Sequence, residues 1–211
     1  MKNRSTTFYI VRHGETEWNA LKRIQGHSNI PLNKNGKIQA KELAKDLSHI
    51  KFDLAFSSDL LRAKRTSEII ALDRKLIIQT TELLREREFG KFEGKFVEEL
   101  SIAALNSLNK TLRLKERHKL RLETGVEGDE EFIARIFTFL REVAIIHTGK
   151  IILVGTHGGV LRILLIHLGF ATYETLGHRS ISNTAYIKLT SDGIDFFVKE
   201  TKGINIESVL K

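Results

Sequence analysis

Two short apolar runs, each ending in a polar loop that carries a histidine, constrain the fold of this chain more than any other feature. The first is residues 8–11 (FYIV), followed by RHG at 12–14, and the second is residues 151–154 (IILV), followed by GTHG at 155–158. Continuous runs of β-branched and aromatic residues are typical of strands buried on both faces of a parallel sheet. The carboxyl ends of parallel strands share one sheet edge, where open α/β sheets bind ligands. The two runs therefore predict an α/β fold with both histidines at one edge.

Helical and strand patterns alternate along the rest of the chain. Apolar residues recur at helical spacing within 36–50, which predicts an amphipathic helix. The other predicted helices span 60–71, 96–108, 130–146 and 160–168, the other strands span 53–58 and 76–79, and a terminal hairpin spans 184–190 and 194–198. Ser58 or Asp59 is placed to cap the helix 60–71. This alternation predicts a three-layer α/β/α sandwich around a mostly parallel central sheet.

Length and composition are those of a globular domain. The chain has 211 residues, 41% of them hydrophobic and 28% charged, and it contains no repeat, linker or low-complexity segment. We therefore expect one domain over 1–211. No apolar stretch is long enough to cross a bilayer, so a soluble, cytoplasmic protein without a membrane partner is expected. Because the chain has no cysteine, disulfides, thiolate nucleophiles and Cys-based metal sites are excluded.

A third strand end adds a cation to the predicted ligand edge. The strand 53–58 ends in SSD at 57–59, and Arg62 falls in the first turn of the next helix, from which its guanidinium can turn back over the sheet edge. Guanidinium groups bind phosphate in bidentate fashion, so Arg12 and Arg62 together predict a clamp for a tetrahedral dianion. The glycines that follow the two histidines would let backbone N–H groups approach the same anion.

Charge also favours an anionic partner. The net charge is +8, and the segment 110–121 (KTLRLKERHKLR) contributes six Lys or Arg against one Glu. This segment is either a solvated helix face or a basic rim of the anion site, and it belongs to a helical, basic insertion expected at about 96–125 near that site. A nucleic-acid partner is not expected, because the aromatic residues are not interleaved with Lys and Arg as stacking platforms would be.

Five sequence blocks carry a resemblance to a known family. They are RHGETEWN (12–19), IQGHSNIPLNKNGKIQA (24–40), FSSDLLRAKRTSEII (56–70), LLREREFGKFEGK (83–95) and GTHGGVLR (155–162). In this order they resemble the histidine phosphatase superfamily, whose fold is the phosphoglycerate mutase-like one. The resemblance covers most of the chain and implies catalysis through a phosphohistidine, with no metal and no cofactor.

The resemblance also implies roles for individual residues. His13 matches the phosphorylated histidine, and Glu86 matches the proton donor that stands four residues before the glycine of the FG pair. The other matches are the phosphate-binding Arg12 and Arg62, the second histidine His157, the phosphoryl-contacting Asn19, the backbone donor Gly158, and Gln25 and Gly26 at the start of the substrate loop. The histidines at 27, 49, 118, 147, 167 and 178 are interpreted as structural or surface residues.

The resemblance favours a histidine acid-type phosphatase that acts on small phosphorylated metabolites, sugar bisphosphates among them. A cofactor-dependent phosphoglycerate mutase is the alternative, although such mutases are usually longer and have a tryptophan in the substrate loop, which here reads IQGHSN at 24–29. A non-catalytic phospho-ligand binding module is the alternative from another class.

Three further features leave substrate and assembly open. The segment 126–128 reads VEG where the family often has Gly-Glu-Ser, and Asn29 stands where an aspartate is frequent. Both departures bear on which substrate is recognised rather than on the phosphate clamp. A homo-oligomer is also open, because the strand edges of the terminal hairpin could pair between subunits.

Overall fold

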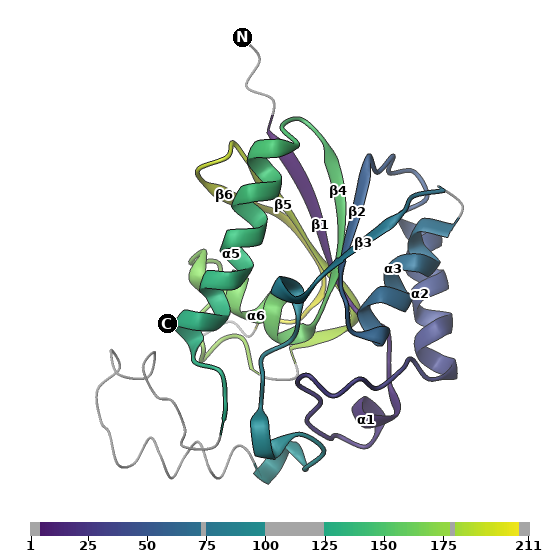
Figure 1. The fold of residues 1–211 in the computed structure, drawn as a ribbon, viewed down its shortest axis with the longest axis vertical. Helices are drawn as coiled ribbons and strands as arrows, with labels where there is room; N and C mark the ends of the chain where they lie inside the picture. Colours follow the sequence, from purple (N-terminus) through teal and green to yellow (C-terminus); the bar gives the residue numbers. More distant parts are fainter. Residues whose placement is uncertain (1–4, 73–74, 100–124, 178–179, 207–211) are drawn as a thin grey trace.

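A six-stranded sheet forms the centre of the molecule (Figure 1). The computed structural model describes residues 5–72, 75–99, 125–177 and 180–206. The strands are β1 (Thr6–Arg12), β2 (Leu54–Ser58), β3 (Ile78–Thr81), β4 (Ile151–Thr156), β5 (Ile181–Ser191) and β6 (Phe196–Ile204), in the spatial order β3-β2-β4-β1-β5-β6. The first four in this order run parallel, whereas β5 is antiparallel to β1 and β6 to β5. The predicted mostly parallel sheet and terminal hairpin are confirmed.

Helices cover both faces of the sheet (Figure 1). They are α2 (Lys34–Asp46) and α3 (Leu61–Ala71) on one face, and α5 (Asp129–Ile146) and α6 (Gly158–His167) on the other. Strand β1 supplies both cores, because Phe8 and Ile10 pack with α5 and α6 while Tyr9 and Val11 pack with α2 and α3. Side chains alternate across a strand, so a strand between two helical layers must be apolar at every position. The predicted three-layer sandwich is confirmed.

Several element boundaries differ from the prediction, and the starts of α2 and β3 are two of them. The helix predicted at 36–50 begins earlier as α2, because the Asn33 side chain accepts a hydrogen bond from the Gly36 N–H at 2.8 Å and so caps it. The strand predicted at 76–79 is displaced along the chain, since β3 begins at Ile78. The helix predicted at 96–108 and the basic segment 110–121 fall largely in 100–124, outside the described residues.

The predicted cap of α3 was wrong. Its N-cap residue is Leu60, whose side chain makes no capping hydrogen bond. Instead, the side-chain oxygen of Asn29 accepts a hydrogen bond from the Leu61 N–H at 2.8 Å, and Ser58 Oγ accepts one from the Leu60 N–H at 3.3 Å. The N–H groups at the start of the helix are therefore partly paired by a loop 32 residues away.

Within the described ranges, no helix is both long and apolar enough to cross a membrane.

The loop that follows β1 packs backbone to backbone against the start of α2. A Cβ added at Gly36 would lie 2.0 Å from the carbonyl oxygen of Glu15, and one added at Gly14 would lie 2.3 Å from the carbonyl oxygen of Gly36. Neither position has room for a side chain. This contact fixes the path of the chain directly after His13.

A Gly36→Ala substitution tests this contact. We expect it to lower the free energy of unfolding by about 1–3 kcal/mol, because overpacking forces a backbone shift. Thermal unfolding would then show a melting temperature lower by several degrees. Gly177→Ala is the matched control, since among the described residues its Cβ would meet only Ser180 Oγ, at 3.6 Å. Equal melting temperatures for the two variants would contradict the expectation.

Candidate active site

The pairing of β1 with β4 brings the two predicted histidines together. Arg12 is in register with Thr156, and the His13 N–H donates to the Thr156 carbonyl at 3.0 Å. The residue that follows β4 is His157, which is the N-cap of α6. The His13 and His157 rings lie edge to face with their centroids 5.2 Å apart. Both imidazoles therefore stand at the carboxyl edge of the sheet, as the sequence predicts.

His13 is held as a neutral, oriented imidazole. Its side chain is buried, and its Nδ1 donates to the Gly14 carbonyl at 2.7 Å, because a carbonyl can only accept. That hydrogen bond places the proton on Nδ1 and leaves the Nε2 lone pair available. Burial first, and then the positive charges of Arg62 and Arg12, hold the pKa of His13 well below its ordinary value of 6.5. The ring is thus uncharged at neutral pH, and its Nε2 is able to act as a nucleophile.

Arg62 is a fully buried cation held by a distant loop. Its Nη1 donates to the Ser28 carbonyl and its Nη2 to the Gly26 carbonyl, both at 2.7 Å. Burial lowers the pKa of Arg62 to about 10, against the opposing charges of Glu86 and Glu93. The group remains charged at neutral pH. These two hydrogen bonds fix the plane of the Arg62 guanidinium close to His13 and His157.

Arg12 supplies the second cation. One of its terminal nitrogens donates to the Ile181 carbonyl, which ties the side chain to β5. Burial lowers the pKa of this guanidinium, and the negative charge of Glu86 opposes that shift. A Cβ at Gly158 would lie 3.2 Å from Arg12 Nε, so the glycine gives the guanidinium room at the start of α6. The two arginines and two histidines predicted to cluster do so.

Several buried polar atoms around this cluster have no hydrogen-bond partner within the described residues. They are Arg12 Nε, Arg62 Nε, Gln25 Oε1 and both ring nitrogens of His157. Buried polar atoms are almost always paired in folded proteins, so such a concentration marks a place built for another molecule. Burial followed by the Arg62 charge holds the pKa of His157 well below 6.5. The N–H groups in this set could all donate to one multivalent anion.

Glu86 lies at the same edge, after the short 3₁₀ helix η2 (Glu82–Leu84). Its Oε2 accepts from the Gly159 N–H at 2.9 Å, and its Oε1 accepts from the Arg87 N–H at 2.8 Å. A Cβ at Gly159 would lie only 2.1 Å from Glu86 Oε1, so the carboxylate sits directly against the first turn of α6. The structure thus brings Glu86 to the buried cations, whose pKa values it influences.

Asn19 and Gly158 also face this region. Asn19 lies in α1 (Glu17–Ala20), and its side-chain oxygen accepts from the Thr16 N–H at 3.1 Å. With the oxygen engaged, the amide nitrogen is the group that can donate to a ligand. Asn183 on β5 donates to the His13 carbonyl at 3.1 Å and to Asn19 at 3.4 Å. Gly158 opens α6, where backbone N–H groups attract anions.

The loop at 25–29 owes its shape to Glu93, which the sequence analysis did not single out. The Glu93 carboxylate accepts from the His27 N–H and Ser28 N–H, both at 2.9 Å, and from Ser28 Oγ at 2.7 Å. Gly26 has a φ of +50°, and a Cβ there would lie 2.1 Å from Glu93 Oε1. Glu93 therefore holds the loop whose carbonyls hold Arg62. The FGKFEGK block contains this glutamate, but no local pattern reveals its partners.

His27 has a structural role, in agreement with its interpretation as a structural or surface residue. Its ring Nε2 donates to the Glu86 carbonyl at 2.9 Å, so it joins the loop at 25–29, the predicted substrate loop, to the segment of the predicted proton donor. His49 and His167 are exposed and His147 is partly exposed, as also expected for structural or surface residues. The predictions for His118 and His178 lie outside the described residues.

Burial of two uncharged imidazoles makes stability depend on pH. The folded-state pKa values of His13 and His157 lie below 6.5, so the unfolded chain binds more protons as the pH falls below 6.5. The free energy of unfolding is expected to decrease from about pH 6.5 downward by about 1.4 kcal/mol per pH unit for each of the two groups.

Denaturant unfolding between pH 5 and pH 7 measures this slope. His13→Asn is expected to reduce it by about 1.4 kcal/mol per pH unit, because one proton fewer is taken up on unfolding. His49→Asn, at an exposed position, is the matched control. Parallel curves for the wild type and His13→Asn would count against the buried neutral imidazole.

Comparisons with known proteins agree with this geometry. Residues 8–202 match the family described as "Histidine phosphatase superfamily (branch 1)". An uncharacterized phosphatase of Bacillus subtilis (strain 168), PhoE, is 30% identical over 207 residues, which cover 97% of each chain. A metal-independent phosphoserine phosphatase of Arabidopsis thaliana is 33% identical over 166 residues, 77% of this chain and 68% of that one.

The fold has a solved counterpart of similar length. The crystal structure of phosphoglycerate mutase from Bacillus anthracis str. Sterne superposes with a TM-score of 0.80 and 27% identity, covering 97% of this chain and 96% of that one. The phosphoglycerate mutase-like architecture expected from the sequence is therefore confirmed. Since the family match also covers nearly the whole length, this chain belongs to the histidine phosphatase superfamily.

Proposed function

We propose that this protein is a metal-independent phosphatase that hydrolyses small phosphomonoesters through a phosphohistidine on His13. The observation that carries the proposal is the set of unpartnered buried polar atoms, Arg12 Nε, Arg62 Nε and the His157 ring among them, around one neutral imidazole. A phosphoryl group has the acceptor oxygens that these donors lack, and its negative charge suits two buried cations.

The first half of the reaction transfers the phosphoryl group to His13. The Nε2 lone pair attacks phosphorus in line, the P–N bond forms and the P–O ester bond breaks. Arg12 and Arg62 stabilise the charge on the equatorial oxygens, and a neutral nucleophile avoids the cost of adding a third positive charge to the site. Glu86, in its protonated form, gives its proton to the leaving alkoxide, which departs as an alcohol.

The second half returns His13 to its starting state. A water molecule attacks phosphorus while the Glu86 carboxylate accepts its proton, so the P–N bond breaks and inorganic phosphate leaves. Glu86 thereby acts as acid and then as base, and both protons are accounted for. Its position against the Gly159 N–H supports this role, because the carboxylate sits beside the cations without forming an ion pair to either of them at hydrogen-bond distance.

The relatives support the choice of reaction class. PhoE, which is matched over nearly its full length, carries the name of a phosphatase, and the Arabidopsis relative is named for hydrolysis of phosphoserine without metal. Both names suit a small monoester as substrate. The mutase title of the solved counterpart keeps phosphoryl transfer to a second substrate hydroxyl as the competing reaction. The phosphatase and mutase reactions differ in whether water or a substrate hydroxyl takes the phosphoryl group from the phosphohistidine.

Hydrolysis in the presence of excess chelator tests the proposal. The wild type is expected to release phosphate from a panel of small monoesters, and His13→Ala is expected to lose at least about 10³-fold in turnover, because the nucleophile is gone. Rapid quenching with ³²P-labelled substrate should trap label on the wild type and none on His13→Ala. His49→Ala, at an exposed imidazole, should match the wild type.

Other outcomes would move the assignment. Interconversion of phosphoglycerates with little release of phosphate would identify a mutase. Binding of phosphate esters without turnover, and without trapped label, would identify a non-catalytic binding module. Turnover that survives in His13→Ala would overturn the phosphohistidine itself.

A further inference from the structure

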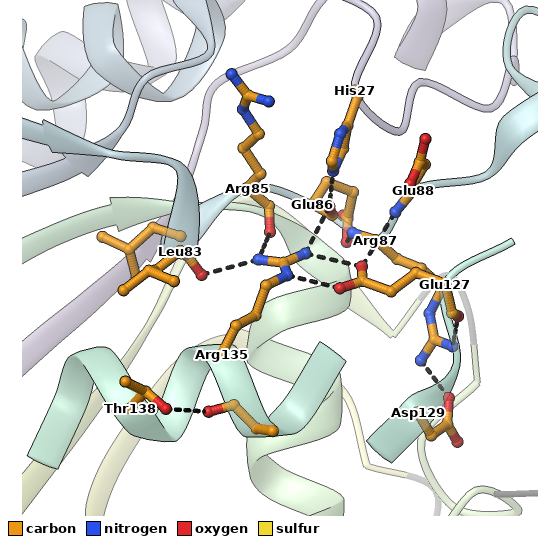
Figure 2. Close-up of polar contacts among 12 residues, drawn as sticks. His27, Leu83, Arg85, Glu86, Arg87, Glu88, Glu127, Asp129, Arg135 and Thr138 are labelled. Carbon is orange, nitrogen blue, oxygen red and sulfur yellow. Dashed lines mark hydrogen bonds and ion pairs between the residues drawn. The ribbon is translucent and has the colours of Figure 1, made fainter. Parts of the chain in front are cut away.

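Arg135 of α5 reaches across to the backbone of the segment that carries Glu86. Its Nη1 donates to the carbonyls of Leu83 and Arg85, at 2.8 and 2.7 Å, and its Nη2 donates to the Glu86 carbonyl at 2.9 Å. Figure 2 shows this guanidinium at the centre of the contacts, with the three carbonyls converging on it. A single side chain thus binds one carbonyl of η2 and two carbonyls of the segment that follows it.

Glu127 fixes the guanidinium from the other side. Arg135 Nε meets Glu127 Oε1 at 2.7 Å and Nη2 meets Oε2 at 2.9 Å, a bidentate pair in which the side chains are only 17% and 12% exposed. Bidentate geometry and partial burial make such a pair far more rigid than a surface ion pair. The Glu127 N–H also donates to the Glu88 carbonyl at 2.9 Å, and the Glu88 N–H donates back to Glu127 Oε2 at 3.2 Å.

The two ends of Glu86 are held differently. Its carboxylate accepts hydrogen bonds from the Gly159 and Arg87 backbone, while its carbonyl accepts from Arg135 and from His27 Nε2 at 2.9 Å. The peptide of Glu86 is therefore pinned by side chains from α5 and from the substrate loop, and only the carboxyl end faces the buried cations. Arg135 touches the backbone of this residue rather than its acid group.

This arrangement matters because proton transfer to a leaving oxygen requires close approach. A general acid must come within about 2.6–3.2 Å of the atom that it protonates, and a displacement of about 1 Å costs on the order of 10²-fold in rate. Residues 85–89 belong to neither helix nor strand, so no backbone ladder holds Glu86 at that distance. The position of Glu86 therefore depends on contacts from other parts of the chain, and the side chains of Arg135 and His27 are the ones that bind its carbonyl.

We propose that the Arg135–Glu127 pair is the positioning unit of the proton donor, holding the Glu86 backbone so that its carboxyl group reaches the leaving oxygen. The inference rests on the proposed function. It assigns a task to Glu127, the central residue of the VEG segment at 126–128, and to Arg135, which the sequence motifs leave out. Neither residue is among the groups with unpartnered buried polar atoms around His13. Arg135 also helps to lower the pKa of His157, so the test must separate the two effects.

Two substrates whose leaving groups differ in basicity separate a loss of proton donation by Glu86 from a change at His157. The p-nitrophenolate of p-nitrophenyl phosphate leaves without a proton, whereas the alkoxide of glycerol phosphate needs one. The value of kcat/KM reports the steps up to formation of the phosphohistidine, and so excludes the shared hydrolysis step. Arg135→Lys and Glu127→Gln are expected to lower kcat/KM about 10²-fold for glycerol phosphate and less than about threefold for p-nitrophenyl phosphate.

Two further variants calibrate the result. Glu86→Gln removes the proton donor and should show the same preference for the aryl ester, at least as strongly. Arg141→Lys, an exposed arginine on the same helix, should leave both substrates unchanged. Melting temperatures of all variants identify any loss caused by unfolding, and Glu127→Gln keeps the test intact if Arg135→Lys does not fold.

Each outcome has one meaning. Equal losses on both esters in Arg135→Lys and Glu127→Gln would overturn the inference, since damage to the phosphate site or to His157 affects both substrates alike. No loss in either variant would overturn it as well. If Glu86→Gln alone shows the preference, the proposed function stands and the positioning role fails. If the wild type hydrolyses neither ester, the proposed function fails and the inference with it.

Discussion

The burial of one permanently charged group, the guanidinium of Arg62, is the constraint on which the site depends. Removing a cation from water is costly unless nearly every donor meets an acceptor or an opposite charge. Here the carbonyls of Gly26 and Ser28 accept two hydrogen bonds, and Glu86 and Glu93 lie near enough to favour the charged form. The partners come from two loops distant in sequence. The need to stabilise one cation therefore determines how both loops are placed.

The same charge also sets the chemistry of its neighbours. Burial first, and then the charges of Arg62 and Arg12, hold the pKa of His13 low, so the groups that would attract a phosphoryl dianion also help to keep the proposed nucleophile uncharged. The positive charges of Arg12 and Arg62 thus favour both the binding of an anion and the uncharged form of His13. A site with fewer cations would bind a phosphoryl dianion less well, and burial alone would then hold down the pKa of His13.

Much of this arrangement follows from sequence because it depends on local patterns. His13 and His157 end recognisable apolar strands, and Arg62 occupies the first turn of a recognisable helix, so a parallel sheet must gather them at one edge. The long-range contacts do not follow in this way. Asn29 caps α3 from 32 positions away, and Arg135 binds the Glu86 carbonyl from 49 positions away. Such contacts depend on tertiary packing, which no local period encodes.

The adjacency of β1 and β4 has one more consequence. Neighbouring strands lie about 4.8 Å apart, and the rings of His13 and His157, one residue beyond paired positions, have centroids 5.2 Å apart. The separation of the two imidazoles in the proposed phosphoryl site thus follows the hydrogen-bond spacing of the sheet, which mutation of loops does not alter. Loops at 25–29 and 85–93 enclose that site from outside. The part that handles the phosphoryl group and the part that meets the rest of a substrate can therefore diverge separately.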